Sequence, residues 1–435
     1  MANLWTNCAG IQSPNPFWLA SAPPTNSGEQ IQRAFDAGWG GAVWKTLGQP
    51  IQNVSSRFGG HTIGGVRGAG FNNIELITDR PLDVNFREIA EVKKKFPKHA
   101  VIASLMVETE QEWEDIICRS VDAGADGLEL NFGCPHGMCE RGMGSAVGQE
   151  PLVNERITSW AKKYAEKYRP GLPVLIKLTP NVSDIVPHGL AAQRGGADGV
   201  SLINTIKSIV SVDIDRFVPE PRVGNLSTNG GYCGAAVKPI ALHMLASLAR
   251  DPRFNLPISG IGGVTNWRDA VEFILLGATS VQVCTEVMLK GYRIVEDMID
   301  GLESYMDSKG FATIDQMVGK AIPNYEHWGD LDLNYEIVAK IDADKCIGCQ
   351  LCVVACMDGA HQCIHPQEGS ATERTTRVPR VDEAECVGCN LCKIVCPVPD
   401  CISMVQVDNG FAPATWNEHL YQGKQLRHRK GSHGW

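Results

Sequence analysis

The segment 131–144, NFGCPHGMCERGMG, holds the side chains best suited to catalysis. It combines a thiol at Cys134 with an imidazole at His136, and its glycines permit backbone conformations that other residues resist. A thiol in such a loop can give a proton to a bound substrate or take one from it. We therefore predict proton transfer by Cys134, with Glu140 and Arg141 serving as charges that order the loop.

A second group of cysteines forms an internal repeat at an offset of 40 residues. The runs 346–356 and 386–396 both have the spacing C-x2-C-x2-C-x3-C. Two-cluster bacterial ferredoxins have this spacing, and in them the fourth cysteine of each run ligates the other cluster. A tetrahedral zinc site would need a different arrangement. The predicted ligands of two [4Fe–4S] clusters are Cys346, Cys349, Cys352 and Cys396 for one, and Cys386, Cys389, Cys392 and Cys356 for the other.

Two further cysteines, Cys363 and Cys401, follow the two runs at similar places. We interpret both as small buried apolar residues rather than as extra ligands. Clusters of this kind transfer one electron at a time, so two-electron chemistry requires another cofactor in the chain. A flavin meets that need.

Composition and charge exclude several classes of function. The chain of 435 residues is 43% hydrophobic and has a formal net charge of −9, which argues against a general affinity for nucleic acid or anionic membranes. No apolar run approaches the ~20 residues of a membrane helix, and the N-terminus lacks the pattern of a signal peptide. We expect a cytoplasmic protein, in which sixteen cysteines indicate clusters and catalysis rather than disulfides.

Short apolar runs alternate with longer amphipathic runs over the first 310 residues. Eight such alternations predict an α/β fold of the (β/α)8 TIM-barrel type. An open doubly wound sheet is the alternative, disfavoured because no GxGxxG follows the first strand. The expected strands are 17–20, 42–45, 101–106, 127–131, 174–178, 199–204, 257–260 and 280–284. The expected helices are 29–37, 84–96, 111–123, 151–168, 184–194, 238–249, 266–276 and 291–309.

Two insertions, 46–83 and 206–237, follow the expected second and sixth strands and show no regular pattern. Long loops at the carboxyl ends of barrel strands usually carry function. We divide the chain into a barrel domain (1–322), a linker (323–336), a small α+β ferredoxin-like domain for the two clusters (337–410) and a basic tail (411–435). The basic stretch 424–435 is interpreted as a solvated terminus, and a docking strap is the alternative.

Residues at the ends of the expected strands suit a flavin. The sequence GIGG at 260–263 and the hydroxyl of Thr285 follow the seventh and eighth strands, where TIM barrels commonly bind phosphate. Lys45 and Lys177 close the second and fifth strands, and a cation there would stabilise a reduced flavin ring. Amides at strand ends, such as Asn131, offer both a donor and an acceptor to a flat heterocycle.

Together these features resemble the dihydropyrimidine dehydrogenase family, in particular the subunit that carries FMN and iron–sulfur clusters in the bacterial NAD-dependent enzymes. The resemblance extends from about residue 15 to 407 and includes GWGGAVWKT, FNNIEL, LNFGCPHGMCERGMG, GGADGVSLINT and both cluster runs. The barrel is also similar to that of class 1 dihydroorotate dehydrogenases.

The resemblance implies roles for residues at matching positions. Cys134 would be the general acid or base toward C5 of a pyrimidine ring, with His136 a loop histidine near it. Residues that would hold the base are Asn73, Glu75, Asn131, Asn204 and Thr205. Residues that would contact the flavin are Ser21, Lys45, Thr46, Lys177, Gly234, Gly262, Gly263, Cys284 and Thr285. Gly133 stands where the animal relatives have serine, which leaves one hydrogen bond to flavin or substrate in question.

The implied reaction is the reversible reduction of uracil or thymine to the 5,6-dihydro base, in which reduced FMN gives a hydride to C6 and Cys134 protonates C5. No nucleotide-binding fingerprint follows a predicted strand, so FAD and NAD(P)H are expected on a partner subunit. The assembly implied is a hetero-oligomer whose barrels form a dimer.

Three alternatives remain open at this point. One is a dihydroorotate dehydrogenase-like enzyme or another cyclic-amide flavin reductase. The second is a tRNA dihydrouridine synthase, which the acidic net charge disfavours. The third is a non-catalytic iron–sulfur subunit that only transfers electrons.

Overall fold

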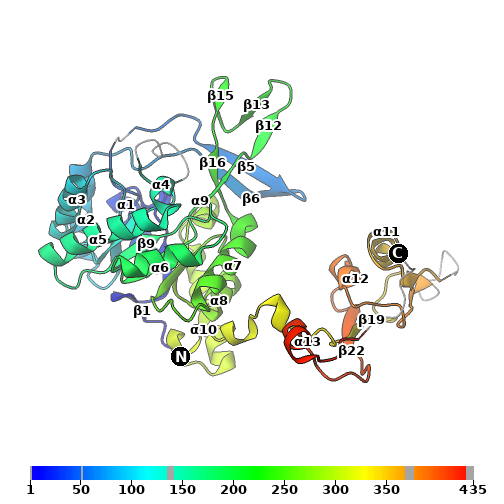
Figure 1. The fold of residues 1–435 in the computed structure, drawn as a ribbon. Helices are drawn as coiled ribbons and strands as arrows, with labels where there is room; N and C mark the ends of the chain where they lie inside the picture. The colour runs from blue at the N-terminus through cyan, green and yellow to red at the C-terminus, as the bar shows by residue number, and fades with distance from the viewer. Residues whose placement is uncertain (1, 50–51, 135–141, 368–376, 428–435) are drawn as a thin grey trace. The chain divides into compact units, whose positions relative to one another are not determined.

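The computed structural model describes residues 2–49, 52–134, 142–367 and 377–427. The chain forms two compact units, residues 1–325 and 326–435, and each is described by itself (Figure 1). The boundary falls inside the segment 323–336 that the sequence analysis proposes as a linker. Two short 3-10 helices, η5 (Ile322–Asn324) and η6 (Trp328–Asp330), lie on either side of that boundary.

A closed barrel of eight parallel strands forms the first unit, which confirms the predicted TIM barrel and excludes the open sheet. Every strand lies within a few residues of an expected one, because the apolar runs are buried on both faces as parallel strands require. The strands are β3 (Phe17–Leu19), β4 (Gly41–Val43), β7 (Ala100–Leu105), β8 (Gly127–Asn131), β9 (Val174–Lys177), β10 (Gly199–Leu202), β17 (Ile258–Ile261) and β18 (Ala278–Val283).

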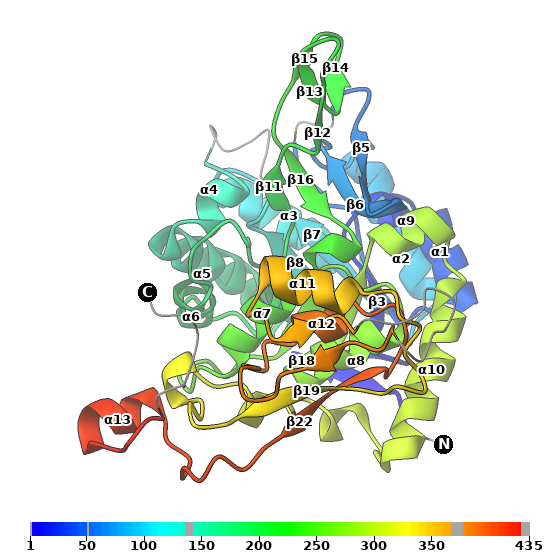
Figure 2. The same ribbon diagram turned by 90° about the vertical axis from the view of Figure 1, so that its right-hand side faces the viewer.

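Helices cover the outside of the barrel (Figures 1 and 2). Capping residues mark where helices begin. At the helix that follows Thr109, the Thr109 hydroxyl accepts from Glu112 N at 3.3 Å, and the Glu112 carboxylate accepts from Thr109 N at 2.8 Å. The eight predicted helices are α1 (Gly28–Ala37), α2 (Leu82–Lys95), α3 (Glu110–Asp122), α5 (Pro151–Tyr168), α6 (Val186–Arg194), α7 (Lys238–Ala249), α8 (Trp267–Leu275) and α10 (Ile294–Lys309). Two short helices were not predicted, α4 (Ser145–Gly148) and α9 (Thr285–Lys290).

An N-terminal hairpin of β1 (Thr6–Cys8) and β2 (Ile11–Ser13) closes the amino end of the barrel. Cys8 and Ile11 are buried there among apolar side chains of the barrel strands. The fit is close, since a Cβ at Gly127 would lie 2.5 Å from Ile11 Cδ1. This end of the barrel is therefore filled, and the opposite end remains for a site.

The two insertions combine into one antiparallel sheet that the sequence analysis did not predict. The first insertion supplies β5 (Phe58–Ile63) and β6 (Val66–Asn73), and the second supplies β11 (Ile206–Ser208) and β16 (Gly230–Cys233). The strand order is β11-β16-β6-β5. Figure 2 shows this sheet and its outer hairpins projecting at the end of the barrel opposite the N-terminus. The outer strands are β12 (Ser211–Asp213), β13 (Val218–Glu220), β14 (Arg222–Val223) and β15 (Leu226–Ser227).

The second unit repeats one small motif twice. Gln350 and Asn390 occupy matching positions with φ of +64° and +68°, each just before a helix. The elements are β19 (Ile337–Ile341) paired with β22 (Ile402–Gln406), β20 (Ile364–His365) paired with β21 (Arg380–Val381), and the helices α11 (Leu351–Gly359) and α12 (Leu391–Ile394).

The described part of the tail is held to this second unit. It contains α13 (Trp416–Gln422), which begins with a capping box at Thr415. Asn334 Nδ2 donates to Ala412 O at 2.7 Å, and Arg427 forms an ion pair with Glu336. Residues up to 427 are therefore folded against their own unit. Most of the stretch 424–435, for which the sequence analysis expected a solvated terminus, lies outside the described residues.

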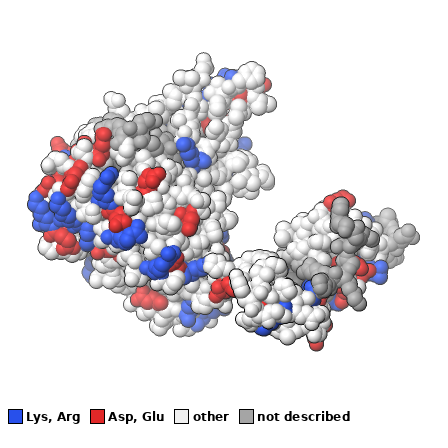
Figure 3. Space-filling model, in the orientation of Figure 1, with Lys and Arg blue, Asp and Glu red and all other residues white. Residues whose placement is uncertain are grey.

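Charges of both signs are interspersed on the face of the barrel unit that Figure 3 shows. Many neutralise one another locally, as Lys162 and Asp198 do at 2.7 Å. Among the described residues, no helix is both long enough and apolar enough to cross a membrane.

Candidate active site

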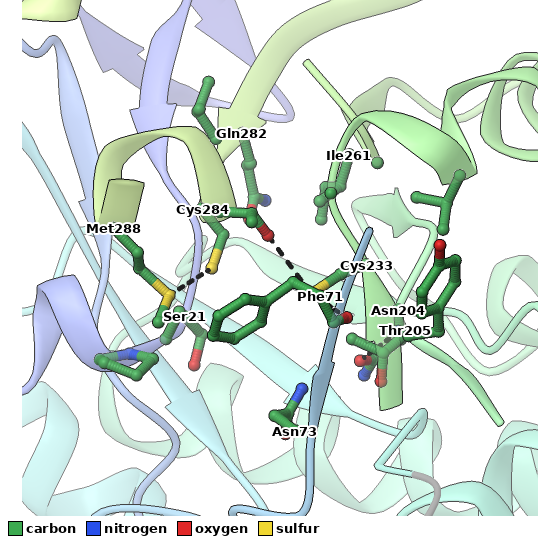
Figure 4. Close-up of a pocket in the computed structure, with 18 of the residues that line it drawn as sticks. Ser21, Phe71, Asn73, Asn204, Thr205, Cys233, Ile261, Gln282, Cys284 and Met288 are labelled. Atoms are coloured by element: carbon green, nitrogen blue, oxygen red, sulfur yellow. Dashed lines mark hydrogen bonds between the residues drawn. The ribbon is translucent and has the colours of Figure 1, made fainter. Parts of the chain in front are cut away.

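A cavity of about 1140 Å³, including its open mouth, lies where the barrel strands end beneath the four-stranded sheet. Figure 4 shows side chains from β6, β16 and the ends of β10 and β18 converging on it. All the barrel residues that the sequence analysis assigns to flavin, base or proton transfer within the described chain line this cavity. They are Ser21, Lys45, Thr46, Asn73, Glu75, Asn131, Cys134, Lys177, Asn204, Thr205, Gly234, Gly262, Gly263, Cys284 and Thr285.

Cys134 follows the end of β8 and has only 6% of its surface exposed. The Ser145 N–H donates to Cys134 O at 3.0 Å, which fixes the backbone of the loop. Gly144 has a φ of +58°, and a Cβ there would lie 2.8 Å from the same oxygen, so this turn requires glycine. The apolar neighbours of the thiol are Ile77, Met106 and Met143. The predicted loop residues His136, Glu140 and Arg141 lie outside the described residues.

A chain of amides and hydroxyls joins residues at or near the ends of five barrel strands around the cavity. Asn204 Nδ2 donates to Asn131 Oδ1 at 2.9 Å, and Asn131 Nδ2 donates to Thr46 Oγ1 at 3.0 Å. Thr46 Oγ1 also lies 3.1 Å from Ser21 Oγ and 2.9 Å from Ser104 Oγ. The network holds both amides in one orientation, as recognition of a flat ring requires.

The close packing of Gly133 against Asn204 explains the glycine of this chain. A Cβ at Gly133 would lie 2.4 Å from Asn204 Nδ2. The amide of Asn204 therefore occupies the space that a serine side chain at this position would need. Gly133 N instead donates to Asn131 Oδ1 at 3.3 Å.

Glu75 forms a buried ion pair with Lys45 and a second ion pair with Arg57. Glu75 Oε2 lies 2.7 Å from Lys45 Nζ, and Glu75 Oε1 lies 2.7 Å from Arg57 Nη1. Arg57 also contacts Asp79 at 2.9 Å. Burial lowers the pKa of Lys45, and the Glu75 carboxylate opposes that shift. The sequence analysis placed Lys45 and Glu75 at the site but did not identify Arg57, which has no motif around it.

Glu129 is the partner of Lys177 inside the barrel. The Glu129 carboxylate is fully buried and lies 3.3 Å from Lys177 Nζ. It also accepts hydrogen bonds from Ser201 Oγ at 2.8 Å and Gln282 Nε2 at 3.0 Å. A glutamate inside an apolar strand was the sequence signal for this group, because buried charges need partners.

Glycines form a cradle at the ends of β17 and β16. Gly262 and Gly263 have φ of +129° and +78°, and a Cβ at Gly263 would lie 2.8 Å from Lys238 N and 2.9 Å from Gly234 O. The N–H groups of Gly262 and Gly263 meet no acceptor in the described part of the chain. Unpaired N–H groups in a glycine-lined loop after the seventh strand suit a phosphate, so these residues fit FMN.

Two thiols lie beside this cradle. Burial raises the pKa of Cys284 to about 12 and that of Cys233 to about 11. The raised pKa of each disfavours the thiolate, which is the nucleophilic form of cysteine. The Thr285 hydroxyl, which the sequence analysis offered to a phosphate, donates to Cys233 Sγ at 3.3 Å.

The second unit contains two small cavities lined by the motif cysteines. One, of about 320 Å³, is lined by Cys346, Cys349, Cys352 and Cys396. The other, of about 300 Å³, is lined by Cys356, Cys386, Cys389 and Cys392. In the described chain no three His, Cys, Asp or Glu side chains meet around a single-ion site. Each group of thiols surrounds a cavity, and each contains the fourth cysteine of the other run, an arrangement that fits two [4Fe–4S] clusters.

Comparison with known proteins agrees with both units. Residues 3–306 match the dihydroorotate dehydrogenase family, and residues 339–404 match the 4Fe-4S dicluster domain. The NAD-dependent dihydropyrimidine dehydrogenase subunit PreA of Escherichia coli K12 is 44% identical over 366 residues, which cover 83% of this chain and 87% of that protein.

Two further relatives match over fewer residues. The chloroplastic dihydropyrimidine dehydrogenase (NADP(+)) of Arabidopsis thaliana is 39% identical over 335 residues, covering 74% of this chain and 78% of that protein. The catalytic subunit of dihydroorotate dehydrogenase B (NAD(+)) of Pyrococcus horikoshii is 36% identical over 313 residues, which cover 72% of this chain and 96% of that protein.

Fold, cavity and matches define a flavin-dependent barrel of the dihydroorotate dehydrogenase type joined to a 4Fe-4S dicluster domain. At this identity and coverage, the chain belongs to the family of the NAD-dependent dihydropyrimidine dehydrogenase subunit PreA. The family resemblance drawn from the sequence is thereby confirmed.

Proposed function

We propose that this chain reversibly reduces uracil or thymine to the 5,6-dihydro base. The observation that carries the proposal is the buried thiol of Cys134 at a cavity framed by oriented amides, in a chain 44% identical to a dihydropyrimidine dehydrogenase subunit. The residues proposed to hold the base are Asn73, Glu75, Asn131, Asn204 and Thr205.

FMN is the flavin that we propose for this cavity. Its phosphate would lie against the N–H groups of Gly262 and Gly263, beside Gly234 and Thr285. Its ring would lie against the remaining residues, Ser21, Lys45, Thr46, Lys177 and Cys284. When bound, the reduced flavin supplies a hydride to C6 of the base.

The chain itself supplies the proton and the orientation. A thiol can act as a general acid, and we propose that Cys134 donates its proton to C5. Asn73 donates Nδ2 to Gly231 O at 3.1 Å, which leaves its Oδ1 for an N–H of the base. In the oxidative direction the Cys134 thiolate would take the proton back.

The pairing of cations in the cavity favours a neutral base over orotate. Within the described residues, the lysines that line the cavity, Lys45 and Lys177, are paired with Glu75 and Glu129. A carboxylate substrate would need a cation that is free to pair with it. An uncharged pyrimidine needs hydrogen-bond donors and acceptors, which this cavity offers.

We further propose that the electrons come from a partner subunit that carries FAD and NAD(P)H. The two [4Fe–4S] clusters, held by the two cysteine groups, would supply one-electron transfer between that partner and the barrel. The name of the relative as a subunit supports an assembly of unlike chains. The proposal includes a dimer formed by the barrels and a cytoplasmic location.

The test uses the full chain purified together with its native partner, with flavin and iron counted before the assay. Uracil and thymine should be reduced with NADH or NADPH, while orotate should not. Orotate turnover without uracil turnover would establish the dihydroorotate alternative. Full flavin and iron content without turnover of any of the three bases would support the alternative of a non-catalytic subunit that only transfers electrons.

A further inference from the structure

The segment 177–182, KLTPNV, contains an amide outside the proposed site, that of Asn181. Lys177 lines the cavity, whereas Asn181 lies in the loop between β9 and α6 and does not line it. Asn181 Nδ2 donates to Thr179 Oγ1 at 3.0 Å, and Thr179 has only 1% of its surface exposed. The loop therefore holds this amide against a buried hydroxyl.

Both ends of the Asn181 amide bind main-chain groups of one segment. Asn181 Nδ2 donates to Thr205 O at 3.2 Å, and Asn181 Oδ1 accepts from Lys207 N at 2.8 Å. A main-chain oxygen can only accept and a main-chain N–H can only donate, so the amide has one possible orientation. A third hydrogen bond, from Asn204 N to Leu178 O at 3.0 Å, joins the same two loops.

The segment that Asn181 binds is the start of an edge strand. β11 pairs with β16 and lies at one end of the order β11-β16-β6-β5, and its other side has no strand partner in the described part of the chain. An edge strand leaves a row of N–H and C=O groups unpaired. Thr205 O and Lys207 N belong to residues two apart, so they point to the same side of the strand. The Asn181 amide therefore takes the place of a neighbouring strand where the chain leaves the barrel.

This contact bears on the residues proposed to hold the base. Asn204 and Thr205 both line the cavity. Thr205 N donates to Asn204 Oδ1 at 2.8 Å, and Asn204 Nδ2 donates to Asn131 Oδ1 at 2.9 Å. Thr205 also packs tightly against Gly231, where a Cβ would lie 2.1 Å from Thr205 Oγ1. A displacement of the main chain at Thr205 would therefore move both amides and the hydroxyl.

We infer that Asn181 is a positioning residue for the base, because it holds the main chain at Thr205. The inference rests on the proposed function, which assigns Asn204 and Thr205 to the base. The proposed proton donor, Cys134, lies on another loop, after β8. Loss of the Asn181 amide should therefore weaken binding of the base, which raises KM for uracil and leaves kcat nearly unchanged.

The kinetic experiment uses the full chain purified with its native partner, with flavin content and thermal unfolding measured for every variant. Asn181→Ala removes both main-chain contacts, and KM for uracil should rise about tenfold, the effect of losing one or two hydrogen bonds between neutral groups. Thr179→Val keeps both contacts but removes the hydroxyl that holds the amide, so KM should rise less. Gln149→Ala is the matched control, because Gln149 Nε2 donates only to the main-chain oxygen of Asn181, at 3.3 Å, and its KM should equal that of the wild type.

Hydrogen–deuterium exchange of the segment 204–208 gives a readout that does not depend on the substrate. Exchange at Lys207 N–H should be faster in Asn181→Ala and unchanged in Gln149→Ala. Unchanged exchange, unchanged KM at full flavin content, a fall in kcat at constant KM, or an equal rise of KM in Gln149→Ala would overturn the inference. If Asn181→Ala does not fold, Thr179→Val decides by the same measurements. Wild-type protein that turns over neither uracil nor thymine would contradict the proposed function, and the exchange comparison would still test whether Asn181 holds the strand.

Discussion

Among single residues, Cys134 gives the sharpest test of the proposed chemistry. Cys134→Ala removes the proton donor, and general acid catalysis typically contributes about 10²–10⁴-fold, so uracil turnover should fall by that factor. Flavin and iron content should be unchanged, because the cradle and the clusters lie elsewhere in the chain. The measurement is kcat with uracil beside an absorbance spectrum. Near-normal turnover would assign the proton to another group.

Arg57 should act through Glu75 without touching the cavity. Arg57→Gln removes a charged hydrogen bond to the Glu75 carboxylate, a contact usually worth about 1.5–3 kcal/mol, so KM for the base should rise roughly 10–100-fold while kcat changes little. Arg57→Lys is the control, because it keeps the charge but loses the forked contact to Glu75 and Asp79. A fall in kcat at constant KM would place Glu75 in the chemical step.

Residue types showed where the site lies but not how its charges pair. Lys45 and Lys177 could be predicted because each ends a buried strand. Their partners could not be identified, because Glu129 in an apolar strand signals a buried charge without showing which lysine it meets, and Arg57 lies in a glycine-rich insertion. Which carboxylate meets which lysine depends on the closure of the barrel, and that is a property of the whole unit.

For the secondary-structure elements, the glycine loop after β17 offers the clearest prediction. Gly263→Ala adds a methyl group where the nearest backbone atoms would lie 2.8 and 2.9 Å away, so the cradle must open and flavin content should fall. Gly310→Ala is the control, because Gly310 also has a positive φ, +73°, but has open space around it. Both variants should lose about 1–2 kcal/mol of stability from backbone strain, and only Gly263→Ala should lose flavin. Equal flavin content in the two variants would show that the glycine loop does not bind the flavin phosphate.

The barrel strands could be predicted from sequence and the sheet above them could not. Barrel strands are continuous apolar runs, so composition alone marks them. β5 and β6 read FGGHTI and VRGAGFNN, with little alternation, and their order depends on pairing with β16 more than 150 residues away, as in Asn73 with Gly231. Such pairing leaves no local signal, yet it brings Asn73 to the site.

For the whole molecule, the buried His188 and the half-buried His99 should make the barrel unit sensitive to mild acid. Burial lowers the pKa of His99 and of His188, so the folded state binds protons at these residues less readily than the unfolded chain does. The unfolded chain protonates them near pH 6.5 and therefore binds more protons below that pH, so the free energy of unfolding should fall as the pH drops from 7 towards 5. His188→Gln should reduce the dependence of the free energy of unfolding on pH, measured by urea titrations at several pH values. An unchanged pH dependence in this variant would show that other titratable groups cause it.

The two units should also differ in their dependence on iron. Among the described residues, the buried core of the second unit consists largely of cysteines, together with a few aliphatic residues such as Val338, Ile364 and Ile402. The barrel core is a large apolar cluster without a motif cysteine. Because metal-binding free energy becomes folding free energy in such small domains, removal of the clusters should unfold residues 326–435 and leave the barrel intact. Calorimetry should then lose one of two transitions, and proteolysis should yield a stable fragment ending near Tyr325. The eight motif cysteines replaced by serine should give the same fragment without any chelator, whereas a second unit that stayed folded without iron would show that its aliphatic core suffices.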